Sequence, residues 1–246
     1  MYQLEVIAFN IASIITAEKA GAHRIELCDN PGEGGTTPSA GMIKRALELT
    51  SLLLYPIIRP RGGDFLYSND EFKIMMNDVE LCKAIGTDGV VFGLLNPDGS
   101  VDTERTRRLV DAAYPLGVTF HRAFDRVNDP AKALEDVIAC GCERILTSGL
   151  RPGVTEGADM LRSLVSQAAD RIIIMPGSGL RSSNLHEIAA KSGAREFHSS
   201  ARMSLPSAMS YMNAEMKEDL VQTGLDEQEV RSLRAIIDQL QLKNQD

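Results

Sequence analysis

The sequence predicts a (β/α)8 barrel, the TIM-barrel fold, as one domain over residues 1–246. Short apolar runs alternate with helix-like segments along the whole chain, and their starts lie about 27 residues apart, the size of one βα unit. Eight such units fill the chain, and no linker or low-complexity tract divides it.

The eight predicted strands are the short apolar runs. They are Leu4–Ala8, Arg24–Cys28, Leu53–Arg59, Gly89–Leu94, Val118–Phe120, Arg144–Thr147, Ile172–Met175 and Glu196–His198. A doubly wound open sheet is the main alternative. The glycine-rich fingerprint of its dinucleotide-binding form is missing after the first strand, where the chain reads AFNIAS.

Helix start and stop signals separate these strands. Ser39 is a candidate N-cap for a helix from Ala40, and Ser68 or Asn69 for a helix that stops at Gly86. Another candidate helix has Asp129 as its cap, Pro130 in its first turn and Gly141 after its end. Leucines and isoleucines three and four residues apart predict a final helix over residues 226–242. Before it, residues 203–216 form a methionine-rich connection, which we expect to cover the core or to form an interface, with a homodimer as the plausible assembly.

Composition narrows the class of protein. With 26 basic and 34 acidic residues, the net charge of −8 argues against a nucleic-acid partner. No apolar run is long enough for a membrane span, and the N-terminus lacks the pattern of a signal peptide. Four scattered cysteines in such a chain predict reduced thiols and a cytoplasmic location.

In this fold, chemistry takes place at the carboxyl ends of the strands, so the polar residues there are the candidate site. The segment VTFHRAFD, residues 118–125, is an apolar strand that runs directly into charge at this rim. The candidate catalytic residues are Glu5, Glu26, Arg59, Arg61, His121, Arg122, Asp125 and His198.

A second group of residues predicts an anion or phosphate site. The loops after the seventh and eighth strands often bind phosphate in these barrels, because glycines let backbone N–H groups approach an anion. Arg181 or Arg202 would add positive charge there. The candidate ligand-binding residues are Ser148, Gly177, Ser178, Gly179, Ser199 and Ser200.

These residue types leave several reactions open. The arginines suit a carboxylate or phosphate, the acids suit acid/base work, and His121 or His198 suits proton transfer near neutral pH. The two histidines with Glu26 or Glu5 could instead chelate a divalent metal. The strand ends offer no lysine, which weakens a Schiff-base mechanism. An enzyme acting on a small anionic metabolite is therefore one reading.

The motifs as a set resemble those of the CutC family from about residue 2 to 202. They are IELCDN, GGTTPSAG, IRPRGGDFLYS, TDGVVFGLLNPDG, VTFHRAFD, RILTSG and EFHSSAR. The resemblance implies a (β/α)8 barrel and a cytoplasmic protein of copper homeostasis, with copper(I) as its bound metal. It leaves open whether the protein is an enzyme.

The resemblance makes Cys28 the candidate copper ligand, since copper(I) prefers thiolates. The first strand departs from the family pattern, because it reads EVIAF where a cysteine is expected. That departure removes one thiol from a two-cysteine site. Cys140 and Cys142 precede the sixth strand, which puts them at the opposite end of the barrel from the site.

Overall fold

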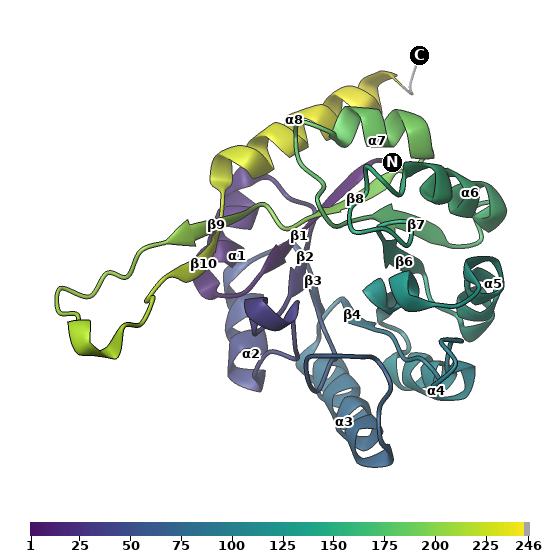
Figure 1. The fold of residues 1–246 in the computed structure, drawn as a ribbon, viewed down its shortest axis with the longest axis horizontal. Coiled ribbons are helices and arrows are strands. Elements are labelled where there is room, and N and C mark those ends of the chain that lie inside the picture. The colour runs from purple at the N-terminus through teal and green to yellow at the C-terminus, as the bar shows by residue number, and fades with distance from the viewer. Residues whose placement is uncertain (244–246) are drawn as a thin grey trace.

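A computed structural model describes residues 1–243, and in it a ring of parallel strands lies inside a ring of helices (Figure 1). The last three residues of the unit predicted over 1–246 lie outside the described residues. The strands of the ring are β1 (Gln3–Ala8), β2 (Arg24–Leu27), β3 (Leu53–Pro56), β4 (Gly89–Phe92), β5 (Gly117–Phe120), β6 (Arg144–Thr147), β7 (Ile173–Pro176) and β8 (Glu196–Ser199).

The predicted (β/α)8 fold is confirmed, and each predicted strand is present. The third and fourth end earlier than expected, at Pro56 and Phe92 rather than at Arg59 and Leu94. The surrounding helices are α1 (Ile11–Ala20), α2 (Ala40–Leu49), α3 (Asn69–Ile85), α4 (Thr103–Ala113), α5 (Pro130–Cys140), α6 (Ala158–Ala168), α7 (Leu185–Ser192) and α8 (Glu227–Lys243). None of the helices within residues 1–243 is long and apolar enough to cross a membrane.

The predicted caps explain where the helices begin and end. Ser39, Ser68 and Asp129 each accept a hydrogen bond from a backbone N–H in the first turn of α2, α3 and α5. Gly86 and Gly141 end α3 and α5 with φ of 91° and 89°, in the left-handed region that glycine enters without steric cost.

Two four-stranded parallel sheets close into the barrel. Their orders are β3-β2-β1-β8 and β4-β5-β6-β7. At one seam Ile57 pairs with Val91, and the Ile58 N–H donates to the Val91 carbonyl at 2.7 Å. At the other seam β7 and β8 lie against each other. All the strands therefore deliver their carboxyl ends to one rim.

The alternation of side chains divides the apolar core from the site. Val118 and Phe120 in β5 pack in the large layer between strands and helices. A smaller apolar cluster, which includes Ile7, Tyr55 and Val91, lies on the opposite face of the strands, inside the barrel. Buried polar and charged side chains, among them Glu5, Arg24 and His198, share the interior with this cluster, and the site forms there.

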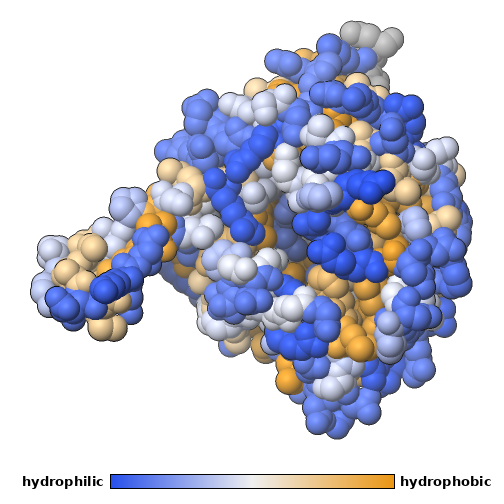
Figure 2. All heavy atoms as spheres, viewed as in Figure 1, coloured by the Kyte–Doolittle hydropathy of each residue, from blue (hydrophilic) through white to orange (hydrophobic). Residues whose placement is uncertain are grey.

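The methionine-rich connection forms an arm rather than a cover for the core. Strands β9 (Arg202–Leu205) and β10 (Gln222–Leu225) pair antiparallel, and the arm between them extends away from the barrel (Figures 1 and 2). Met209 is 63% exposed and Met212 is 61% exposed. The expectation that these residues cover the core is wrong, because the barrel already covers its core with α1 to α8. The expectation of an interface stays a prediction.

Candidate active site

A cavity of about 460 Å³ opens at the rim formed by the carboxyl ends of the strands. Figure 2 shows hydrophilic residues gathered around the centre of this face. The predicted site residues that line the cavity are Glu26, Arg59, His121, Arg122, Ser178, Gly179, His198 and Ser200. The remaining predicted ones, Glu5, Cys28, Arg61, Asp125, Ser148, Gly177 and Ser199, contribute no lining atoms.

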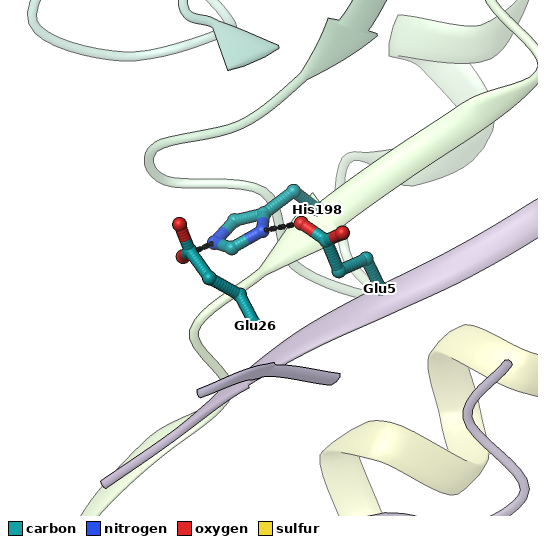
Figure 3. Close-up of side chains that lie close together, drawn as sticks. All are labelled: Glu5, Glu26 and His198. Carbon is teal, nitrogen blue, oxygen red and sulfur yellow. Dashed lines mark hydrogen bonds and ion pairs between the residues drawn. The ribbon is translucent and has the colours of Figure 1, made fainter. Parts of the chain in front are cut away.

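His198 lies between two glutamates from neighbouring strands (Figure 3). Its Nδ1 is 2.7 Å from Glu5 Oε1, and its Nε2 is 3.8 Å from Glu26 Oε2. Register explains the arrangement, because β1 pairs with both β2 and β8 and sets Glu5 opposite His198. An ionised carboxylate only accepts hydrogen bonds, so Glu5 holds the hydrogen on Nδ1 and leaves Nε2 facing Glu26.

The two glutamates titrate in opposite directions. Burial alone would raise the pKa of Glu5, but the Arg24 charge and the hydrogen bond from His198 lower it to about 2. Burial raises the pKa of Glu26 to about 7, and the charge of Glu5 adds to this rise. Burial opposes a positive His198, yet its hydrogen bond to Glu5 and the nearby carboxylates raise its pKa. Glu26 therefore gains and loses a proton near neutral pH, with His198 Nε2 3.8 Å away.

A buried layer of ion pairs lies beneath His198. Arg24 is 1% exposed, and it donates to Glu5 and, at 2.6 Å, to Glu196. Arg144 Nε donates to the same Glu196 oxygen at 2.9 Å. These partners satisfy charges that burial would otherwise make costly. Arg24 was not among the residues predicted for the site, although an arginine at the start of a strand buried on both faces was a signal for such a layer.

His121 differs from His198 in its surroundings. Its Nδ1 accepts a hydrogen bond from the Ala123 N–H at 3.3 Å. Burial, with the nearby charge of Arg59, lowers its pKa to about 3, so the ring is neutral near pH 7. The ring lies against Gly93, where a Cβ would come within 2.6 Å of Nδ1. Of the two histidines predicted for proton transfer, only His198 suits that role.

Asp125 positions its neighbours and has no free oxygen. It accepts from Arg122 Nε at 2.7 Å, from the Ser148 N–H at 3.0 Å and from the Thr147 hydroxyl. The Ser148 hydroxyl also contacts Arg122 Nη2 at 3.1 Å. Asp125 and Ser148 therefore hold Arg122 at the cavity wall instead of touching a ligand there.

The two arginines after β3 are separated in the structure. Arg59 lines the cavity and donates to three backbone carbonyls of the loops after β2 and β3, at 2.6 to 2.9 Å. Arg61 lies outside the cavity, where it pairs with Asp64 and Glu71. The prediction of both arginines for the site assumed a third strand reaching Arg59, so that residues 59 and 61 would lie on one face. Because β3 ends at Pro56, the alternation no longer holds at these residues.

The predicted anion loop contributes part of the cavity wall. Ser178 and Gly179 both have positive φ, 81° and 72°, and both line the cavity with Ser200. The Ser199 hydroxyl points away and donates to the Leu180 carbonyl at 2.7 Å. A Cβ on Gly177 would come within 2.4 Å of Leu146 Cδ1 and 3.3 Å of His198 Cδ2, so this glycine leaves room mainly for Leu146.

Arg202 and Phe65 complete the wall, and neither was among the residues predicted as the core of the site. Arg202 is exposed and lies over the ring of Phe9, 4.8 Å from its centroid, and partial desolvation of its guanidinium lowers its pKa. From the sequence, Arg202 was predicted only as one of two sources of extra charge. Phe65 was missed, although an aromatic residue in a glycine-rich loop between arginines and an aspartate was a usable signal.

The donors available for a metal are mostly oxygen and nitrogen. One atom each from Glu5, Glu26 and His198 lies within 4.8 Å of the others, and this group lacks His121. Cys28 is 1% exposed, and burial raises the pKa of its thiol well above the usual value. The other cysteines, Cys82, Cys140 and Cys142, are buried and free, and none lines the cavity.

Comparison with known proteins gives one consistent result. Residues 2–203 match the model of the CutC family. A CutC family protein of Chromobacterium violaceum is 50% identical over 241 residues, which cover 96% of this chain and 98% of that protein. A human protein named copper homeostasis protein cutC homolog is 46% identical over 213 residues, covering 87% of this chain and 78% of its own.

A solved structure agrees with these sequence relatives. The crystal structure of the CutC protein of Streptococcus agalactiae superposes with a TM-score of 0.77 at 35% identity, covering 81% of this chain and 98% of that one. The chain belongs to the CutC family.

Proposed function

We propose that the cavity of this CutC-family barrel binds a small anionic metabolite and catalyses proton transfer on it. The observation that carries this proposal is the placement of His198 between Glu5 and Glu26 at the wall of a basic cavity. A group whose pKa lies close to the working pH is suited to both accept and return a proton. Glu26, with its pKa raised to about 7, is such a group.

The cavity supplies separate sites for charge and for chemistry. Arg122 and Arg202 provide positive charge for a carboxylate or phosphate, and Ser178, Gly179 and Ser200 line the same wall. The His198–Glu26 pair is then the base that removes a proton from a carbon next to a carbonyl or carboxylate. The same pair returns the proton to the product.

The name of the human relative connects that protein with copper, but the cavity of this chain does not suit copper(I). Copper(I) prefers thiolate and thioether ligands. Within residues 1–243, Cys28 is the thiol near the rim, and burial keeps it protonated. The clustered donors Glu5, Glu26 and His198 offer oxygen and nitrogen atoms, which are harder ligands than copper(I) prefers. We therefore derive no step through copper. A role in copper homeostasis would then depend on the metabolite rather than on a thiolate site. Four free cysteines support a reducing compartment such as the cytoplasm.

Deuterium incorporation tests the proposed chemistry without knowledge of the physiological substrate. The protein is incubated in D2O with a panel of phosphorylated and carboxylated metabolites, and exchange at carbon is followed by NMR and mass spectrometry. We expect exchange in at least one metabolite and its loss, by at least 100-fold, in His198→Asn. Asparagine keeps a polar group at the position of Nδ1 but has none at that of Nε2. His186→Asn, on the exposed surface of α7, is the matched control and should exchange as the wild type does.

Thermal shift with inorganic phosphate measures binding separately. We expect phosphate to raise the melting temperature of the wild type and to have less effect on Arg122→Gln. The proposed function would be contradicted if no metabolite showed exchange and phosphate did not stabilise the wild type.

A further inference from the structure

Two buried N–H groups beside the cavity have no hydrogen-bond partner among residues 1–243. They are Nε of Arg59 and Nε2 of His121. The residues are 5% and 4% exposed, and both contribute to the cavity lining. Because His121 Nδ1 accepts from the Ala123 N–H, the hydrogen of the neutral ring is on Nε2. Both unpartnered atoms are therefore donors.

Phe65 packs against both of these residues. The centroid of its ring is 4.8 Å from that of His121, and Arg59 Cζ lies 5.1 Å from the Phe65 centroid. Phe65 is only partly buried, and it contributes to the 460 Å³ cavity and to a neighbouring cavity of about 520 Å³. Its side chain thus has open space on two sides, whereas the donors that it packs against do not reach water.

An unpartnered buried donor costs free energy, because the group has lost its water without gaining an acceptor. The rest of Arg59 is fully used, since its other nitrogens donate to loop carbonyls. Two such donors lie under one aromatic side chain. An acceptor oxygen would stabilise them by hydrogen bonds, whereas the apolar ring alone cannot.

We propose that Phe65 is a gate over an oxygen-binding subsite made by Arg59 Nε–H and His121 Nε2–H. The subsite takes a carboxylate or carbonyl oxygen of the ligand after the Phe65 side chain swings into one of the two cavities. This inference rests on the proposed function and defines its substrate class: the anion carries a carbonyl or carboxylate oxygen that two N–H groups receive. His121 acts as a neutral donor to that oxygen, while His198 and Glu26 handle the proton.

A pair of histidine substitutions separates the two ring nitrogens. In His121→Asn the amide oxygen can replace Nδ1 as the acceptor of the Ala123 N–H, but nothing replaces Nε2–H. In His121→Gln the amide N–H can replace Nε2–H instead. Thr106→Val is the matched control, because the Thr106 hydroxyl is also buried and unpartnered among the described residues but does not line the cavity.

Oxalate is the probe, and binding is measured by calorimetry. We expect His121→Asn to bind oxalate roughly 10- to 100-fold more weakly than the wild type, since one hydrogen bond to a charged group is lost. His121→Gln should recover part of that loss, and Thr106→Val should bind as the wild type does.

Phe65→Ala tests the gate itself. Stopped-flow measurement should give a larger association rate constant for oxalate, and NMR of labelled histidine should show faster solvent exchange of the His121 Nε2 hydrogen. Equal oxalate affinity in wild type and His121→Asn would overturn the subsite. Unchanged association and exchange rates in Phe65→Ala would overturn the gate. A wild type that binds neither oxalate nor phosphate would overturn the proposed function as well, whereas one that binds phosphate but not oxalate would overturn only this inference.

Discussion

At the scale of single residues, the position of a carboxylate matters more than its identity. Glu5 and Glu26 are both glutamates in adjacent strands and both are buried. Glu5 contacts Arg24 and is held ionised, whereas Glu26 has no such partner and keeps its proton to near neutral pH. One residue type thus supplies both the group that orients His198 and the group that exchanges a proton with it.

The raised pKa of Glu26 predicts how stability changes with pH. Below the ordinary pKa of 4.5 the carboxyl is protonated in both the folded and the unfolded chain. Between 4.5 and about 7 the unfolded chain releases that proton while the fold retains it, so the stability of the wild type falls as pH rises. Glu26→Gln has no proton to lose there. We expect its free energy of unfolding, relative to the wild type, to grow by up to about 3 kcal/mol from pH 4.5 to 8.

Urea unfolding at pH 4.5, 6 and 8 measures this difference. Glu48→Gln on the exposed face of α2 is the control, and its difference from the wild type should not vary in the same way. Parallel pH profiles for wild type and Glu26→Gln would mean that Glu26 titrates normally in the fold.

The sequence could not predict the surroundings of each site residue in the folded protein. His121 follows β5 and His198 lies in β8, yet burial and the charge of Arg59 keep the first ring neutral, whereas the second is flanked by acids. The difference depends on which strands are neighbours, since β8 closes onto β1 across nearly the whole chain. Arg61 shows the same limit, because its distance from the cavity follows from where β3 ends.

At the scale of elements, local sequence signals were reliable where the interactions are local. The caps at Ser39, Ser68 and Asp129 involve residues within one helical turn, and all three form as predicted. The arm between β9 and β10 was not predicted as a hairpin. Methionine-rich sequence has little period-2 alternation to indicate strands, so composition alone suggested a cover for the core.

The exposed arm predicts the assembly of the protein. Met209, Tyr211 and Met212 are each more than 60% exposed, an arrangement more typical of a contact surface than of a free loop. We expect a homodimer that depends on the arm. Replacing residues 206–221 with Asn-Gly joins Leu205 to Gln222, which already face each other in the hairpin, through a tight turn.

Light scattering after gel filtration should give a dimer for the full chain and a monomer for the shortened one. The shortened chain should keep its melting temperature within about 3 °C at low concentration, because the barrel core does not include the arm. A monomeric full chain, or a shortened chain that still dimerises, would exclude the arm as the interface.

At the scale of the whole molecule, the order of the elements was predictable from the sequence because each βα unit repeats the same pattern. The chemistry of the interior was not, since buried charge there depends on strands that meet only when the ring closes. The thiols illustrate this point. Cys28 is near the rim as expected, but the fold buries it against Gly35, where a Cβ would come within 3.1 Å of its sulfur.

This burial predicts weak binding of copper(I) by the whole chain. We expect anaerobic titration against a copper(I) chelator to give the same result for the wild type, for Cys28→Ser and for the Cys140→Ser/Cys142→Ser double variant. The physical reason is that burial raises the pKa of these thiols and so disfavours the thiolate that copper(I) needs. Stoichiometric copper that disappears in Cys28→Ser would contradict this expectation and restore a thiolate site.

The ion-paired layer of Arg24, Glu196 and Arg144 affects how readily a hydrogen abstracted from the ligand can exchange with solvent. It closes the barrel beneath His198 with side chains that are 9% exposed or less. A hydrogen taken by the His198–Glu26 pair can therefore exchange with solvent only through the rim, where a bound ligand would lie. Label abstracted from one position of a metabolite should be returned to that same molecule more often than it is lost to water.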